Sequence, residues 1–138
     1  MFDADQYSLV DFGDGRKLER FGPYLIDRPC SAARDVTRAN RGLWRQAQTR
    51  FERNGKNQGI WKGKKLSPWI LKHETLSFQL RPTPFGHLGI FVEQAENWSW
   101  LKRQIKRQSG NRPRVLNLFA YTGGSTLAAA QAGAEVIH

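Results

Sequence analysis

The sequence contains a single cysteine, no long apolar run and few acidic residues. Cys30 alone excludes an internal disulfide framework and a CxxC metal site, so we expect a small, half-buried thiol there. No run of about 18 apolar residues is present, and the N-terminal MFDADQYSLV carries acids where a signal peptide needs basic and then apolar residues. We therefore expect a soluble, cytoplasmic protein without a membrane partner.

Histidine is also scarce, with three in the chain. His73 and His87 have no cysteine and no third histidine near them in the sequence, whereas Zn²⁺ takes three or four such ligands. The sequence therefore predicts no metal site.

Positive charge is abundant, because 22 Lys and Arg face 12 Asp and Glu and give a net charge of +10. Residues 34–65 hold ten basic and two acidic side chains, and residues 97–134 hold six basic and none acidic. Such a charge density favours polyanionic partners through counterion release. A basic surface that only maintains solubility is the alternative. With 39% hydrophobic residues, the chain can still build a core.

Period-two patterns predict two β-hairpins. Residues 7–22 form the first, turning at Asp14-Gly15, a dipeptide typical of type I′ turns, and its charged second arm is predicted to be exposed. Residues 22–32 are predicted to be a connector. Residues 75–92 form the second pair of strands, and the NRPR at residues 111–114 marks a domain boundary.

Apolar residues recur at helical spacing between Arg34 and about Arg53, and this spacing predicts an amphipathic helix over that segment. On the opposite face of this predicted helix, four arginines gather one turn apart: Arg34, Arg38, Arg41 and Arg45. Guanidinium groups match phosphate oxygens, so this row is a candidate RNA contact, and a solvated helix face is the alternative.

A second amphipathic helix is predicted from Gln94 to Gln108, with Gly110 as its C-terminal cap and four residues in its apolar stripe: Ala95, Trp98, Leu101 and Ile105. Another side of this helix carries Trp100, Arg103 and Arg107. An indole beside guanidinium groups is suited to stacking on an RNA base. Packing of Trp100 against a neighbouring domain is the alternative reading.

The most informative stretch is VLNLFAYTGGSTLAAAQAGAEVIH. It predicts a strand at residues 115–120, a glycine turn at 121–124, a helix capped by Ser125 or Thr126 and closed by Gly133, and a second strand at 135–138. Glycines let a ligand approach the backbone, and the first helical amides face a negative group, either a phosphate or a carboxylate. Neither GxGxxG nor a P-loop is present.

This stretch resembles the first cofactor motif of class I S-adenosylmethionine (SAM)-dependent methyltransferases, in the NLFAYTGG version of the ribosomal-RNA large-subunit methyltransferase group. YSLVDFGDGRKLERFG, RPC and GHLGIFVEQAENWSWL also resemble the region that precedes the cofactor domain in that group. The resemblance implies a basic α+β region at residues 1–110 that presents the substrate, which we expect to be RNA. At residues 111–138 it implies the first βαβ portion of an incomplete Rossmann-like α/β domain that binds SAM.

The resemblance also implies which residues contact SAM. Glu93 and Gln94 would lie close to the cofactor, and Asn117 stands where many class I methyltransferases have an acid. The segment FVEQ lacks a proline that the related segment often has. The methionine and ribose side would be lined by Phe119, Ala120, Tyr121, Thr122, Gly123 and Gly124.

The leading functional hypothesis is therefore the N-terminal portion of a SAM-dependent methyltransferase that acts on RNA, with rRNA as the expected substrate in rRNA processing. The acid that would hold the ribose hydroxyls lies about 20 residues beyond the first strand, just past His138. We thus assign no catalytic residue within this chain and expect the chain alone to be inactive. Two alternatives stay open: a stand-alone RNA-binding module, and an assembly element that pairs through residues 115–138.

Overall fold

The computed structural model describes residues 1–55, 58–108 and 112–138, which form two compact units. The first, here called the sheet unit, comprises residues 2–73 and 77–89. The second, the helix unit, comprises residue 1, residues 74–76 and residues 90–138. The predicted helix cap at Gly110 and the first residue of the predicted domain boundary, Asn111, lie outside the described residues.

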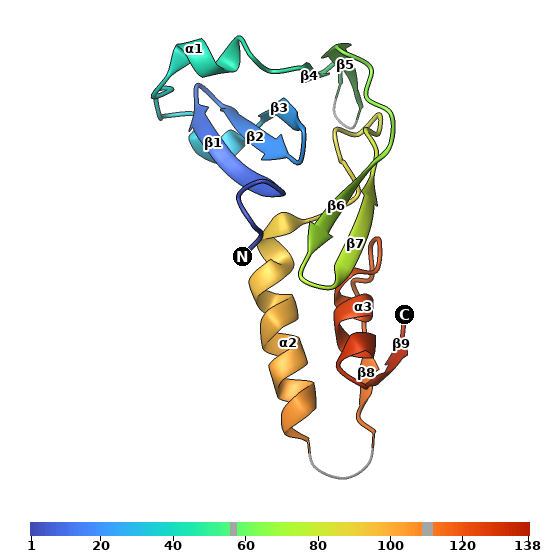
Figure 1. Cartoon of the computed structure of the whole chain (residues 1–138). Helices are drawn as coiled ribbons and strands as arrows, with labels where there is room; N and C mark the ends of the chain where they lie inside the picture. The colour runs from blue at the N-terminus through green and yellow to red at the C-terminus, as the bar shows by residue number, and fades with distance from the viewer. Residues whose placement is uncertain (56–57, 109–111) are drawn as a thin grey trace. The chain divides into compact units, whose positions relative to one another are not determined.

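The sheet unit is built around a five-stranded sheet in which the strands follow one another in chain order (Figure 1). Neighbouring strands are antiparallel except for β3 and β4, which are parallel. A 3₁₀ turn at Ser31–Ala33 and the short helix α1, Arg41–Trp44, lie between those two strands in the chain. The strands are β1 (Tyr7–Gly13), β2 (Arg16–Phe21), β3 (Tyr24–Pro29), β4 (Thr49–Arg53) and β5 (Gly59–Gly63).

The first predicted hairpin is confirmed. Asp14 and Gly15 both have positive φ, 52° and 71°, as a type I′ turn requires. The prediction of an exposed second arm is wrong, because β2 lies between β1 and β3 and buries Leu18 and Glu19 completely. The predicted connector at residues 22–32 is wrong as well, since it contains β3.

Glu19 explains why a charged strand can be buried. Its carboxylate accepts two hydrogen bonds from the Arg28 guanidinium, at 2.6 and 2.9 Å, and one from the Tyr7 hydroxyl at 3.0 Å. The Lys17 ammonium lies 3.0 Å from the same carboxylate. A buried carboxylate is tolerated when it is paired and hydrogen-bonded in this way.

The predicted helix over residues 34–53 is wrong: the segment contains only the four-residue α1 and then β4. Backbone groups at the start of this segment bind the β1–β2 hairpin. The carbonyl groups of Ala33 and Val36 accept hydrogen bonds from the amides of the hairpin turn, at 2.9 and 2.7 Å. The Asp11 carboxylate accepts the amides of Ala39 and Asn40, at 3.2 and 3.1 Å. Tertiary hydrogen bonds therefore override the helical period.

The second predicted strand pair is confirmed only in part. Strand β7 (Leu76–Leu80) forms as expected, but it pairs with β6 (Trp69–His73) and not with residues 87–92. The chain after β7 folds back through backbone hydrogen bonds from Arg81 to Leu88 and from Thr83 to His87, both 3.0 Å.

In its described residues, the helix unit contains two helices, a 3₁₀ turn and a pair of parallel strands. Helix α2 confirms the second predicted amphipathic helix, and it buries Ala95, Trp98 and Ile105. Ile105 packs with Ala129 and Ala134 in the core of the unit, so α2 and α3 lie side by side (Figure 1). The elements are Val92–Gln94 (3₁₀), α2 (Ala95–Arg107), β8 (Arg114–Leu116), α3 (Gly124–Gln131) and β9 (Glu135–Ile137).

Helix α2 belongs to the same compact unit as residues 112–138. Its apolar stripe packs on α3. The chain as a whole is a mixed α/β protein whose largest sheet is mostly antiparallel. None of the helices in the described residues is long and apolar enough to cross a membrane.

Candidate functional site

The glycine turn of the helix unit begins earlier than predicted. Strand β8 ends at Leu116, and the chain turns after the Asn117 amide has made one more hydrogen bond, of 2.9 Å, to the Ile137 carbonyl of β9. Helix α3 begins at Gly124, and Gly123, with φ of 93°, is its N-cap. The predicted caps Ser125 and Thr126 lie inside the helix. Residues 117–123 thus form a loop between the end of β8 and the first turn of α3.

Gly124 is required by its neighbour in α2. A Cβ at this position would lie 2.6 Å from Cζ2 of Trp98, which is closer than real Cβ contacts. The Trp98 ring therefore rests directly on the N-terminus of α3 and fixes where that terminus lies. The first amides of a helix have no intrahelical partner, so this terminus offers donors to a negative ligand group.

The other end of α3 is closed as the sequence predicts. Gly133 has φ of 100°, and its amide bonds to the Ala130 carbonyl at 3.0 Å. The Ala134 amide bonds to the Ala129 carbonyl at 3.2 Å, which completes a Schellman motif. A helix fixed at both ends gives the loop in front of it a defined anchor.

Asn117 is part of a hydrogen-bonded chain at the carboxyl ends of the two parallel strands. Its Nδ2 donates to the Thr126 hydroxyl at 2.9 Å, and that hydroxyl lies 2.8 Å from His138 Nδ1. The amide side chain is therefore held by the first turn of α3. Ligands of parallel α/β sheets bind at this edge.

The loop exposes apolar side chains that a folded protein usually buries. Phe119 is 92% exposed and Leu118 is 74% exposed. Tyr121 adopts a left-handed backbone conformation, with φ of 47°, and its ring lies 4.5 Å from that of Phe91, between centroids. Ala120 is partly buried and Thr122 is exposed. An exposed apolar group beside helix amides is suited to a ligand with an apolar and an anionic part.

The Phe91–Tyr121 contact also brings the segment with Glu93 and Gln94 towards the loop. Both residues lie in the 3₁₀ turn that leads into α2. Glu93 is exposed, and Gln94 Oε1 accepts a hydrogen bond of 2.9 Å from Asn97. Phe91 and Trp98 are the first and last residues of the segment FVEQAENW. Neither was predicted to belong to this site.

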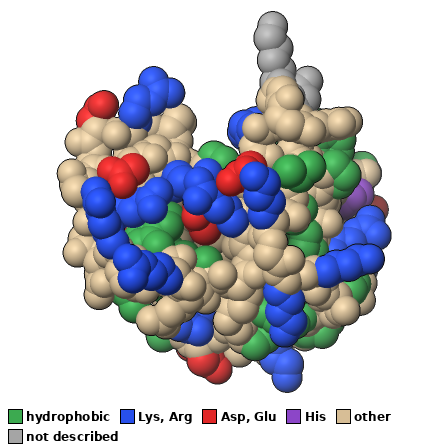
Figure 2. All heavy atoms as spheres, turned by 90° about the horizontal axis from the view of Figure 1, so that it is seen from above, with side chains coloured by type: hydrophobic (Ala, Val, Ile, Leu, Met, Phe, Trp, Pro, Cys, Tyr) green, Lys and Arg blue, Asp and Glu red, His purple; other side chains and the backbone are tan. Residues whose placement is uncertain are grey.

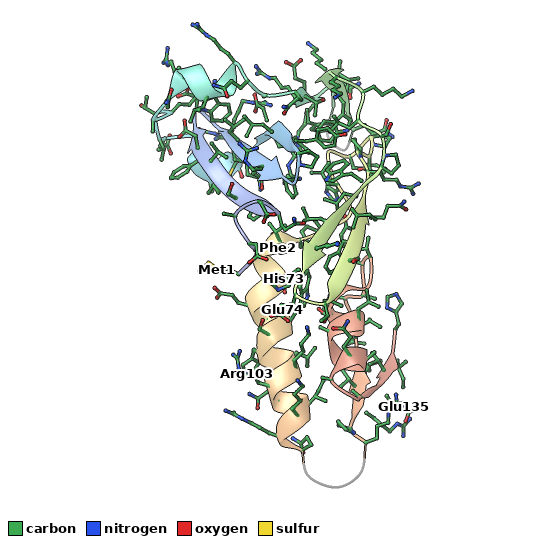
Figure 3. The ribbon with its side chains drawn as sticks, in the orientation of Figure 1. Met1, Phe2, His73, Glu74, Arg103 and Glu135 are labelled. Carbon is green, nitrogen blue, oxygen red and sulfur yellow. The ribbon has the colours of Figure 1, made fainter. Side chains whose placement is uncertain are left out.

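The turn between β6 and β7 binds both helices of the unit. The Glu74 carboxylate, labelled in Figure 3, accepts hydrogen bonds from Lys102 at 2.8 Å and Ser99 at 3.3 Å, both on α2. The Thr75 hydroxyl bonds to Gln131 of α3 at 2.9 Å. This clamp stabilises the α2–α3 pair that carries the loop.

The outer side of α2 carries the predicted RNA-binding residues Trp100, Arg103 and Arg107. Trp100 is 54% exposed, and both arginines are exposed. Arg103 points away from α3 in Figure 3. The three side chains thus present an open, basic and aromatic surface.

The predicted arginine row is rearranged, because its helix does not form. Arg38, Arg41 and Arg45 line a cavity of about 490 Å³ in the sheet unit, together with Arg50 of β4. Arg34 does not line it. Figure 2 shows Lys and Arg side chains in a band across the face seen from above, with acidic side chains among them. Arg50 could not be found from helical spacing, because it reaches the cavity through the β3–β4 pairing.

Two carboxylates beside this cavity have shifted pKa values. Burial of Asp27 raises its pKa, although hydrogen bonding to Arg16 and the charges of Arg16, Arg50 and Arg38 oppose the shift. Burial of Asp11 also acts to raise its pKa, but hydrogen bonds from Trp44 and three backbone amides hold that pKa below the usual value. Asp11 is therefore the ionised anchor of the segment that carries the arginines.

Comparison with known proteins gives the following matches. A ribosomal RNA large subunit methyltransferase K/L from Magnetococcus marinus is 35% identical over 65 residues, which are 47% of this chain and 8% of that protein. The crystal structure of a SAM-dependent methyltransferase from Agrobacterium tumefaciens is 36% identical with a TM-score of 0.83, and the match covers 99% of this chain and 44% of that one. The chain is similar to part of a SAM-dependent methyltransferase.

Two further structures share this methyltransferase fold at 18% identity, and each match covers 94% of this chain and 36% of the other. One is a candidate SAM-dependent methyltransferase from Streptococcus mutans, with a TM-score of 0.64. The other, with a TM-score of 0.61, is a candidate methyltransferase complexed with SAH. No protein-family model matches the chain. The methyltransferase resemblance predicted from the sequence is thus confirmed, over less than half the length of these relatives.

Within the described residues, no group of three or more His, Cys, Asp or Glu side chains is placed to hold a metal ion. Cys30 is a free, partly buried thiol, as the sequence predicts. The chemistry that the chain offers at the methyltransferase-like turn therefore comes from helix amides, an amide side chain and exposed aromatic rings.

Proposed function

We propose that this chain forms the front part of a SAM-dependent methyltransferase that acts on RNA. The observation that carries the proposal is the exposed loop 117–123, placed between the end of β8 and the N-terminus of α3. The similarity to SAM-dependent methyltransferases over 99% of the chain supports it. In this proposal β8, α3 and β9 are the first βαβ portion of a Rossmann-like sheet.

SAM combines an aromatic adenine base and a positively charged methylsulfonium group with polar ribose and amino-acid groups. We assign the methionine carboxylate to the amides at the start of α3, next to Gly123 and Gly124, because a helix N-terminus favours negative charge. Phe119 and Tyr121 would line the methionine and ribose side, with Ala120 and Thr122 beside them. Asn117, Glu93 and Gln94 would supply hydrogen bonds from the two flanking segments.

RNA is the proposed methyl acceptor. The support is the net charge of +10 and the printed name of the Magnetococcus relative, a ribosomal RNA methyltransferase. The arginines of the sheet unit and the exposed surface of Trp100, Arg103 and Arg107 would bind it, and Arg34 would add a further positive charge. An rRNA substrate implies a cytoplasmic protein.

Isothermal titration calorimetry of the full-length protein with SAM and with SAH tests the cofactor assignment. We expect both ligands to bind with a stoichiometry of one. As a matched pair, Asn117→Leu in the site should weaken binding, while Asn40→Leu in the sheet unit should not. Absence of heat from both ligands, with a folded protein, would remove the methyltransferase proposal.

A stand-alone RNA-binding function is the second candidate, favoured by the arginine-lined cavity of the sheet unit. It predicts that the full-length protein binds RNA but neither SAM nor SAH. The same calorimetry, together with an RNA-binding assay, separates the two candidates.

A further inference from the structure

Four arginines line the cavity of about 490 Å³ in the sheet unit. They come from three places in the chain: the segment before α1, α1 with its C-cap, and strand β4. Two carboxylates and an indole ring complete the lining. The residues are Asp14, Asp27, Arg38, Arg41, Trp44, Arg45, Ala47 and Arg50.

Carboxylates hold two of the four guanidinium groups in place. Arg38 Nε lies 3.2 Å from an Asp14 oxygen, and Arg50 Nε lies 3.6 Å from Asp27 and 3.3 Å from Glu52. Asp27 is shared with Arg16, whose Nε lies 2.6 Å from it. These two arginines are thus oriented before any ligand arrives, which reduces the entropic cost of binding.

The other two guanidinium groups have unused donors. Throughout the described ranges, Arg41 and Arg45 form no side-chain hydrogen bond or ion pair, and both are exposed. They lie one helical turn apart, at the start of α1 and at its C-cap. Each guanidinium carries five N–H donors, so the pair can take two neighbouring anionic groups.

The aromatic ring in the cavity is not available to a base. Trp44 is 8% exposed, and the Arg38 guanidinium lies 4.0 Å from the centre of its ring. The indole N–H donates to Asp11 at 2.7 Å, which turns the polar edge of the ring away from any ligand. The cavity therefore presents charge without an aromatic platform on which a base could stack.

From these observations we infer that the cavity binds the phosphodiester backbone of RNA, independently of sequence, as a docking site within the sheet unit. Arg41 and Arg45 bind successive phosphates, and Arg38 and Arg50 supply the fixed charge behind them. The inference rests on the proposed function in taking RNA as the substrate. It adds that this contact positions the RNA and does not select its sequence.

The test measures RNA binding by the full-length protein with fluorescence anisotropy, using two single-stranded RNA oligonucleotides of equal length and unrelated sequence, over a series of salt concentrations. The variant is Arg41→Gln/Arg45→Gln. Its control is Lys65→Gln/Lys72→Gln, which removes the same charge from exposed positions of the sheet unit outside the cavity. Circular dichroism checks that both variants melt as the parent does.

For the cavity variant we expect affinity to fall about tenfold to a hundredfold for both oligonucleotides, as for lost charge-assisted hydrogen bonds. The slope of log K against log salt should decrease by about 1.4, since each phosphate contact on a single strand contributes about 0.7. In the control variant, both the RNA affinity and the salt slope should change much less. Equal losses in variant and control, or a loss confined to one sequence, would overturn the inference.

Calorimetry with SAH on the same protein separates this inference from the proposed function. Binding of SAH with no binding of either RNA would overturn the docking site and leave the methyltransferase proposal standing with another acceptor. Binding of RNA with the expected losses, but no binding of SAH, would support the docking site and remove the methyltransferase proposal.

Discussion

The indole ring of Trp98 rests on Gly124, so that a Cβ at residue 124 would lie 2.6 Å from the ring. This contact joins the apolar stripe of α2 to the N-terminus of α3, where the loop 117–123 ends. It makes the position of the loop depend on a helix that is distant in the sequence.

Gly124→Ala should therefore disturb the turn. Backbone conformation does not demand glycine here, since φ of Gly124 is not positive, so any loss comes from overpacking against Trp98. We expect the free energy of unfolding to fall by about 1–3 kcal/mol and SAH binding to weaken. Chemical denaturation and calorimetry measure the two effects.

Gly55→Ala is the control, because a Cβ there meets nothing within 4 Å. A double variant, Trp98→Leu/Gly124→Ala, tests the cause: the cost of the alanine should shrink once the large ring is gone. If the losses in free energy of unfolding caused by Trp98→Leu and Gly124→Ala simply add in the double variant, contact with the Trp98 ring does not explain the need for glycine at residue 124.

Phe119→Ser should separate binding from stability. A side chain that is 92% exposed contributes little to folding, so the free energy of unfolding should change by less than about 0.5 kcal/mol. If SAM covers this ring, affinity for SAH should fall about tenfold to a hundredfold, as for the loss of a buried aromatic contact. Phe85→Ser, at a 51% exposed ring of the sheet unit, should leave SAH affinity unchanged. Unchanged affinity in both variants would place the cofactor elsewhere.

Arg28→Met should destabilise the sheet unit strongly. It removes two hydrogen bonds from Glu19, whose side chain is fully buried, and leaves a buried charge with fewer partners. We expect a loss of about 3–5 kcal/mol in urea denaturation. Lys17→Met removes a more exposed partner of the same carboxylate, 31% exposed, and should cost less than about 1 kcal/mol. Comparable losses would show that Arg28 does not neutralise Glu19.

Asp11→Asn should change how stability depends on pH. The Asp11 carboxylate has a lowered pKa in the folded protein, so its stabilisation is present above the unfolded pKa of about 3.9 and is lost as pH falls through the folded pKa. The variant should be less stable than the parent at pH 7, and the two should converge as pH falls below about 4. Thermal melts between pH 3 and 7 measure this difference.

Asp35→Asn, which removes a charge from an exposed position, is the matched control. Its melts should follow those of the parent across the whole range. A difference between Asp11→Asn and the parent that stays constant with pH would mean that the charge of Asp11 does not hold residues 39–44.

The hairpin at Asp14-Gly15, the stripe of α2 and the strand–turn–helix order around Gly123 were all predictable, because each depends on local backbone preference or on a period of a few residues. The helix over residues 34–53 was not. Its apolar spacing was real, but Asp11 and the amides of a hairpin turn compete for the backbone groups that a helix would need. The buried position of Glu19 depends likewise on Arg28, nine residues away on the next strand.

In the candidate cofactor loop, too, some features follow from the sequence and others depend on tertiary contacts. Its glycines and aromatic residues, and its resemblance to SAM-dependent methyltransferases, follow from the sequence by itself. Only the tertiary structure reveals that Trp98 fixes Gly124, that Phe91 meets Tyr121, and that Arg50 joins three arginines of the mispredicted helix around one cavity. Local chemistry determines which residues can turn or carry charge, whereas packing between distant segments decides which of them meet.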